Sequence, residues 1–208
     1  LFNYGYNGLM DLFNVTLESV EIRFFIPEFH TFLSIGGYVP FTGGKIGDIH
    51  INVFFIRGVK GVIEIIALHE LIHHFLYKAG LSPRDLLWFH EGIAQYVSIE
   101  IADALGYEGA LSERDRLEEG ASQLIQLGEN FNFLQQWNPE NQPADVSASY
   151  VASYYVVSRL ASMYGELNYY KNFFRLINGR QVNDNNVLAY HLSLAANTSV
   201  VPTLKRWG

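Results

Sequence analysis

The chain has 208 residues, of which 49% are hydrophobic and 15% aromatic, so it can bury a substantial core and is not expected to be disordered. Its net charge of -7, with no cluster of Lys and Arg, excludes a nucleic-acid-binding surface. The sequence contains no cysteine, which excludes disulfides and thiolate metal sites, and no apolar run long enough to span a membrane. We therefore expect a single domain over residues 1–208 in which any metal is held by His and carboxylate groups.

The first part of the chain, residues 1–57, is expected to be rich in β-strands. Residues 15–26 alternate in character and contain β-branched side chains up to Pro27, and residues 49–56 form a second strongly strand-like run. Glycine pairs at 36–37 and 43–44 predict turns between them. We interpret the 49–56 strand as a sheet edge to which an extended peptide could add as another strand.

From Gly61 onward the apolar residues recur at helical spacing, which predicts a helical half over residues 60–208. Gly80 and Pro83 are expected to end the first helix. Further helices are predicted at 86–104, from an N-cap at Ser112 to about 127, at 149–163 before Gly165, at 167–178 and at 184–196, with a loop at 130–144. Strands that precede helices in this way indicate an α+β fold, with an N-terminal mixed β-sheet followed by a mainly helical half.

The strongest chemical signal is the segment His69-Glu70-Leu71-Ile72-His73. Residues four apart lie on one face of a helix, so both imidazoles can reach one ion. Glu70 lies beside the first ligand and can reach a metal-bound water without binding the metal itself. This pattern is a known zinc signature and predicts metal-dependent hydrolysis.

A catalytic zinc site usually has three protein ligands and a water, so a third ligand is needed. The candidates are His74, His90 and Glu91. His74 points about 100° away from His73 around the helix and is a poor ligand. The metzincin class is excluded, because its required Gly and third His positions hold Leu76 and Ala79.

The zinc signature and the following segment Trp88-Phe-His-Glu-Gly-Ile-Ala-Gln-Tyr96 together resemble the gluzincin peptidases, particularly those with aminopeptidase-like catalytic domains. The resemblance implies a thermolysin-like domain with the zinc site between sheet and helices. It also implies one Zn²⁺ per chain bound by His69, His73 and Glu91, and a zinc-bound water activated by Glu70. Where these aminopeptidases usually carry Asn, this chain has His90.

The similarity continues at residues 150–165, which look like the gluzincin helix that begins with a catalytic Tyr and ends in Gly. By this match Tyr150 would donate a hydrogen bond to the oxyanion of the tetrahedral intermediate. The Gly-x-Met-Glu-Asn segment with which the aminopeptidases bind a free amino terminus has no counterpart here. We therefore expect a zinc metalloendopeptidase that acts on a peptide or protein substrate.

Two other functions are compatible with the same residues. The domain could bind zinc but be held latent by self-association or by a partner, or it could use a zinc-stabilised fold only as a binding surface. Glu70 argues against the last function, because a purely structural metal site does not need this carboxylate.

Each proposed site residue also has a purely structural interpretation. His69 and His73 could be core histidines, Glu91 a carboxylate favoured near a helix N-terminus, and Tyr150 an ordinary core aromatic. An aromatic stripe in the helical half is most simply core, with a hydrophobic substrate groove as the alternative; it comprises Tyr154, Tyr155, Tyr164, Tyr169, Tyr170, Phe173 and Phe174.

Overall fold

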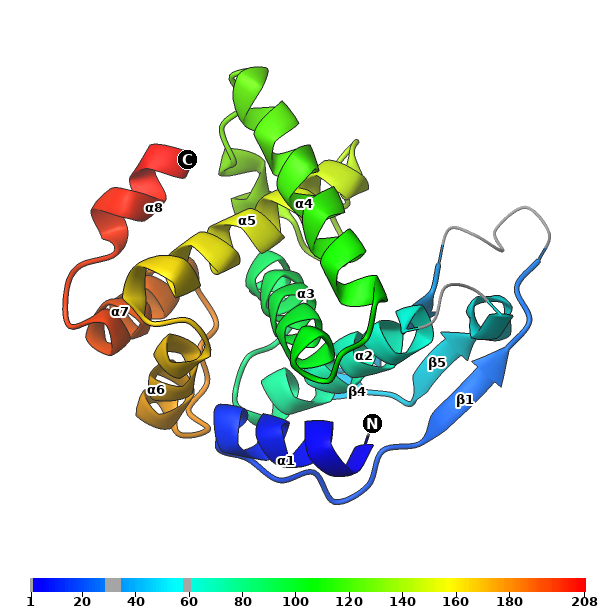
Figure 1. Ribbon diagram of the computed structural model, residues 1–208. Coiled ribbons are helices and arrows are strands. Elements are labelled where there is room, and N and C mark those ends of the chain that lie inside the picture. Colours follow the sequence, from blue (N-terminus) through cyan, green and yellow to red (C-terminus); the bar gives the residue numbers. More distant parts are fainter. Residues whose placement is uncertain (1, 29–34, 58–60) are drawn as a thin grey trace.

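A computed structural model describes residues 2–28, 35–57 and 61–208 of the chain. The described residues form an α+β fold with a small sheet near the N-terminus and eight α-helices (Figure 1). The predicted α+β class, with a mixed sheet near the N-terminus and a mainly helical remainder, is confirmed. Residues 29–34 of the predicted β-rich part, and residues 58–60 before the first predicted helix, lie outside the described residues.

The chain begins with a helix that the sequence pattern did not predict. α1 (Phe2–Phe13) buries Leu9, Leu12 and Phe13 against the helical half. The Phe13 ring lies 4.5 Å from that of Phe174 and 5.5 Å from that of Phe75, measured between centroids. The prediction that residues 1–57 are β-rich is therefore wrong for residues 2–13.

Within the described residues, the main sheet has three strands in the order β1 (Ile22–Phe25), β5 (Ile49–Asn52) and β2 (Gly37–Tyr38). β1 runs parallel to β5 and β2 runs antiparallel to it, so the sheet is mixed, as predicted. A separate hairpin pairs β3 (Phe41–Thr42) with β4 (Lys45–Ile46) around Gly43 and Gly44. Both glycines have positive φ angles, which confirms the predicted turn.

Four details of the predicted strands and turns are wrong. The 15–26 run pairs only over β1, and the 49–56 run leaves the sheet after Asn52 and continues as the 3₁₀-helix η1 (Val53–Arg57). The side-chain oxygen of Asn52 accepts a hydrogen bond from the Phe54 N–H, which stabilises this turn out of the sheet. β5 is the central strand rather than an edge, and Gly37, predicted in a turn, belongs to the outer strand β2.

Seven helices follow the sheet in the described residues. They are α2 (Val62–Lys78), α3 (Leu87–Ala104), α4 (Gly109–Gln126), α5 (Val146–Tyr164), α6 (Leu167–Ile177), α7 (Asn185–Ala196) and α8 (Val201–Trp207). The predicted bounds are close for α2, α3, α6 and α7. Ser112 is not an N-cap, because α4 already begins at Gly109, and α5 begins three residues early, where the Asp145 carboxylate accepts a hydrogen bond from the Ala148 N–H. The predicted 130–144 loop contains the 3₁₀-helix η2 (Asn132–Gln136).

Helices α2, α3 and α5 form the centre of the molecule, with α3 packed against both of the others. The sheet lies on one side of this group and α6, α7 and α8 lie on the opposite side (Figure 1). Most of the aromatic stripe is buried core, as its simpler interpretation predicted: Tyr154, Tyr169, Tyr170, Phe173 and Phe174 are each at most 2% exposed. Among the described residues, no helix is both long and apolar enough to cross a membrane.

Candidate metal centre

Two adjacent helices carry the predicted ligands. His69 and His73 lie on α2, and Glu91 lies on the second turn of α3. The turn between these helices is held against the loop between α6 and α7. In this contact the Val182 N–H donates a hydrogen bond to the Gly80 carbonyl. Gly80 has a φ of +100°, and a Cβ there would lie 2.3 Å from the Arg180 carbonyl oxygen. Glycine therefore allows the close turn that brings α3 back beside α2.

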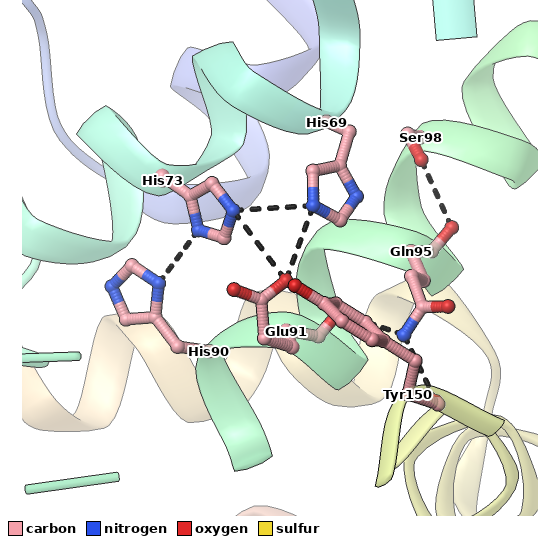
Figure 2. Close-up of polar contacts among 7 residues, drawn as sticks. All are labelled: His69, His73, His90, Glu91, Gln95, Ser98 and Tyr150. Atoms are coloured by element: carbon pink, nitrogen blue, oxygen red, sulfur yellow. Dashed lines mark hydrogen bonds and ion pairs between the residues drawn. The ribbon is translucent and has the colours of Figure 1, made fainter. Parts of the chain in front are cut away.

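The three side chains converge on one point (Figure 2). The Nε2 atoms of His69 and His73 are 3.2 Å apart. Glu91 Oε2 lies 3.2 Å from the His69 Nε2 atom and 3.6 Å from the His73 Nε2 atom. Within the described residues this is the group of His and carboxylate side chains that could hold a metal ion.

These distances match the requirements of a tetrahedral cation site. Ligand bonds of about 2.0–2.2 Å at tetrahedral angles place neighbouring ligand atoms about 3.3–3.6 Å apart. The observed separations of 3.2, 3.2 and 3.6 Å lie at or close to this range. Two imidazole nitrogens and a carboxylate oxygen are also a donor set that zinc accepts, so the residues fit a divalent ion.

Without a cation, the charges of the site compensate one another only in part. Burial raises the pKa of Glu91, but the charges of His73 and His69 and the hydrogen bond from His69 outweigh it, so the pKa is lowered overall. Burial lowers the pKa of His69, yet the hydrogen bond to Glu91 and the charge of Glu70 raise it above its usual value. Burial also holds the pKa of His73 well below its usual value. These shifts favour an ionised Glu91 carboxylate beside His69 and the neutral form of the His73 imidazole, which is the form that binds metals.

Glu70 is 5% exposed and lies next to the cluster without belonging to it. Burial and the charge of Glu91 raise the pKa of Glu70 to about 7, although His69 acts in the opposite direction. The backbone of β2 passes very close to this carboxylate, since a Cβ on Gly37 would lie 3.0 Å from Glu70 Oε1. A carboxyl group with this pKa can both accept and release a proton near neutral pH.

Tyr150 lies on the first turns of α5 and points toward Glu91 (Figure 2). The charge of Glu91, together with burial and the charge of Glu70, raises the pKa of the Tyr150 phenol, so the phenol keeps its proton and can donate it in a hydrogen bond. The Gln95 side-chain amide donates to the backbone carbonyls of Tyr150 (3.0 Å) and Glu91 (3.4 Å). Gln95 therefore ties the start of α5 to the metal-binding turn of α3.

His90 and His74 differ in their relation to the cluster. The His90 imidazole is 1% exposed, and its Nδ1 atom lies 2.8 Å from Nδ1 of His73. Burial lowers the pKa of His90 to about 3, against a smaller opposing effect of the Leu81 backbone carbonyl. His74 does not belong to the cluster. This agrees with the prediction that it points away from His73 around the helix.

Two hollows share Glu70 in their linings and extend toward opposite ends of α2. The larger, of about 650 Å³, extends toward the start of α2 and is lined by Val62, Ile65, Ile66, Ile99, Glu113 and Arg116, among others. The smaller, of about 290 Å³, extends toward the end of α2 and is lined by Tyr38, Phe41, Pro83, Trp137 and Pro139, among others. Gly37, His69, Glu70 and Tyr150 line both hollows, so the two meet where the candidate catalytic groups lie.

The chain matches no protein-family model, no curated protein and no solved structure. The structure brings together all five residues singled out in the sequence, with three converging on one point and Glu70 and Tyr150 beside them. Gln95 had no predicted role, Gly37 was predicted only in a turn, and His90 was considered only as a candidate third ligand. For a supporting role of His90, its position directly before Glu91 was the available signal.

Proposed function

We propose that this protein is a zinc-dependent metalloendopeptidase of the gluzincin type. The observation that carries the proposal is the convergence of His69 Nε2, His73 Nε2 and Glu91 Oε2, with the buried Glu70 carboxyl beside them. In such a site, a bound zinc ion lowers the pKa of a water molecule toward about 7 and polarises the carbonyl to be attacked.

The protein's own residues supply the proton transfers. The Glu70 carboxylate accepts the proton of the attacking water and then donates it to the nitrogen of the leaving amine. A pKa of about 7 in the metal-free site indicates that both forms of this carboxyl are accessible. The Tyr150 phenol donates a hydrogen bond to the oxygen of the tetrahedral intermediate.

The two hollows favour cleavage inside a chain rather than at its end. They extend from Glu70 toward the two ends of α2, so there is room for substrate residues on both sides of the scissile bond. The carboxylates in their linings are Glu70, Glu91 and Glu113. Glu113 pairs with Arg116 at 2.6 Å, so among the described lining residues no unpaired carboxylate outside the catalytic group is available for a substrate's amino terminus.

The outer strand β2 offers a place for an extended substrate. Within the described residues it pairs only with β5, and it passes beside Glu70 at Gly37. A substrate segment adding to the outer side of β2 would bring a peptide bond past the candidate base. This assigns to β2 the peptide-binding role expected of the 49–56 strand, which the central position of β5 excludes.

The test is zinc content, measured by mass spectrometry on protein purified without added zinc, together with hydrolysis of a fluorogenic peptide library. We expect about one zinc per chain, lost in His73→Ala. Glu70→Gln should keep the zinc and lose about 10²–10⁴-fold in hydrolysis. Glu113→Gln changes a carboxylate of the same hollow outside the ligand cluster, and should keep both zinc and most activity. Zinc-free wild-type protein after reconstitution would refute the proposal, and full activity of Glu70→Gln would refute the mechanism.

A further inference from the structure

The contact between His73 and His90 is a hydrogen bond between two buried imidazoles. Their Nδ1 atoms are 2.8 Å apart, and the ring planes are 10° from parallel. His90 is 1% exposed and His73 is 9% exposed, so both imidazoles are largely shielded from bulk solvent. A short contact between two ring nitrogens requires that one carries a proton and the other offers a lone pair.

The metal site decides which nitrogen carries the proton. His73 directs Nε2 toward His69 and Glu91, and a metal ligand must offer a lone pair at that atom. A neutral His73 therefore carries its proton on Nδ1 and donates it to Nδ1 of His90. His90 must then hold its own proton on Nε2. The reverse arrangement would put the His73 proton on Nε2 and block the ligand position.

We propose that His90 is a positioning residue, which accepts the His73 Nδ1–H hydrogen bond and so fixes the tautomer and ring orientation that His73 needs to bind the metal. This inference rests on the proposed zinc site. Metal-binding histidines generally give their second N–H to an acceptor, and loss of that acceptor typically weakens metal binding about 10–100-fold.

The alternative is that His90 only fills space between α2 and α3. The two roles are separable, because the accepting atom of His90 lies at the δ position of the side chain. The side-chain oxygen of Asn can occupy the same position, and Leu has nearly the shape of Asn without an acceptor. An acceptor role requires Asn to substitute for His90 better than Leu, whereas a packing role favours Leu over Asn at a buried position.

The experiment measures the zinc dissociation constant of the purified protein by competition with a chromophoric chelator, with circular dichroism as a check on folding. Four forms are compared: wild type, His90→Leu, His90→Asn and His90→Phe, the last retaining a ring without an acceptor. His74→Phe is the matched control. Like His90, His74 is a buried histidine next to a ligand in the sequence, but it does not belong to the ligand cluster.

We expect His90→Leu and His90→Phe to bind zinc about 10–100-fold more weakly, and His90→Asn and His74→Phe to bind close to wild type. Wild-type zinc affinity in His90→Leu or His90→Phe would overturn the inference. So would a zinc affinity of His90→Asn as low as that of His90→Leu, or an equally large loss of affinity in His74→Phe. If Leu does not fold, the Asn and Phe pair decides the question. Absence of zinc from the wild type would instead refute the proposed function. That outcome is distinguishable from failure of the His90 inference, in which the wild type binds zinc and the His90 variants bind it equally well.

Discussion

Glu70 is the residue whose chemistry depends most on its surroundings. Its carboxyl is 5% exposed, near the Glu91 carboxylate, and the β2 backbone at Gly37 lies against it. Burial disfavours the ionised form, which is why its pKa rises from 4.5 to about 7 in the absence of a metal. The residue proposed as the base is therefore a source of instability in the metal-free protein.

This gives a pH-dependent prediction for Glu70→Gln in protein kept metal-free with a chelator. A carboxyl with a higher pKa in the folded state binds its proton more readily there, so its contribution to stability falls as pH rises from about 4.5 to about 7. Gln has no carboxyl group to ionise, so the variant does not lose this stability as the pH rises. We expect the variant to gain on the order of 2–3 kcal/mol of unfolding free energy at pH 8 and less than about 1 kcal/mol at pH 5. Urea denaturation at both pH values measures this, and a gain independent of pH would contradict it.

A second prediction concerns the Tyr150 hydroxyl. If it stabilises the oxyanion, Tyr150→Phe should lower kcat and kcat/KM together by about 10²–10³-fold, because the hydrogen bond forms only in the transition state. Zinc content should not change. Tyr155→Phe is the control, since this neighbour on α5 packs on Trp207 and Phe131 and lines neither hollow. A rise in KM with unchanged kcat would show that Tyr150 binds substrate rather than the transition state.

For individual residues, the sequence predicted those positions that the geometry of a single helix determines. Helical spacing placed His69 and His73 on one face, whereas Glu91 was assigned as the third ligand through the resemblance to the gluzincin peptidases. The contacts of His90, Gln95 and Gly37 depend instead on how α2, α3, α5 and β2 approach one another. No periodicity in the sequence encodes those approaches.

Among the elements, α3 does the most to assemble the site. It carries Glu91, packs on α2 and α5, and binds the start of α5 through Gln95. Its approach to α5 is unusually close at Gly92, where a Cβ would lie 2.6 Å from the Ser153 carbonyl oxygen and 2.7 Å from Val157 Cγ2. Glycine at this position sets the distance between the helix with the third ligand and the helix with Tyr150.

Gly92→Ala should therefore destabilise the protein even though Ala is the better helix former. Overpacking of this kind costs about 1–3 kcal/mol, and the gain in helix propensity offsets up to about 1 kcal/mol. Gly8→Ala on α1 is the matched control, because no atom lies within 4 Å of the new Cβ, and it should be neutral or stabilise by up to about 1 kcal/mol. Thermal or urea denaturation compares the two, and equal effects would mean that the α3–α5 contact adapts freely.

The elements that were predicted well are those whose packing follows their own periodicity. α2, α3, α6 and α7 show apolar faces in the sequence and lie where expected. α1 was missed because it contains Gly5 and Gly8, which lower helix propensity, and its burial against Phe75 and Phe174 stabilises it. The 15–26 run was overextended because Val15, Leu17 and Val20 pack against the core without pairing in the sheet.

At the scale of the whole molecule, the candidate site joins the sheet to the helical half. β2 lines both hollows from the sheet side, and α5 lines them at Tyr150. The proposed metal ligands lie on α2 and α3, between β2 and α5. A metal ion bound there would cross-link two central helices and neutralise part of the charge of two buried carboxylates, Glu70 and Glu91. Metal binding and folding stability are thus expected to be coupled.

The coupling can be measured as a thermal shift. Free zinc at about 100 times its dissociation constant stabilises the folded state by about 2.7 kcal/mol, which corresponds to roughly 5–10 °C in Tm for a domain of this size. A chelator should reverse the shift, and His73→Ala should not respond to zinc at all. An equal shift in His73→Ala would place the zinc at another position, and no shift in the wild type would mean that His69, His73 and Glu91 do not bind it. A shift confined to the wild type ties the stability of the central helices to the ligands proposed for catalysis.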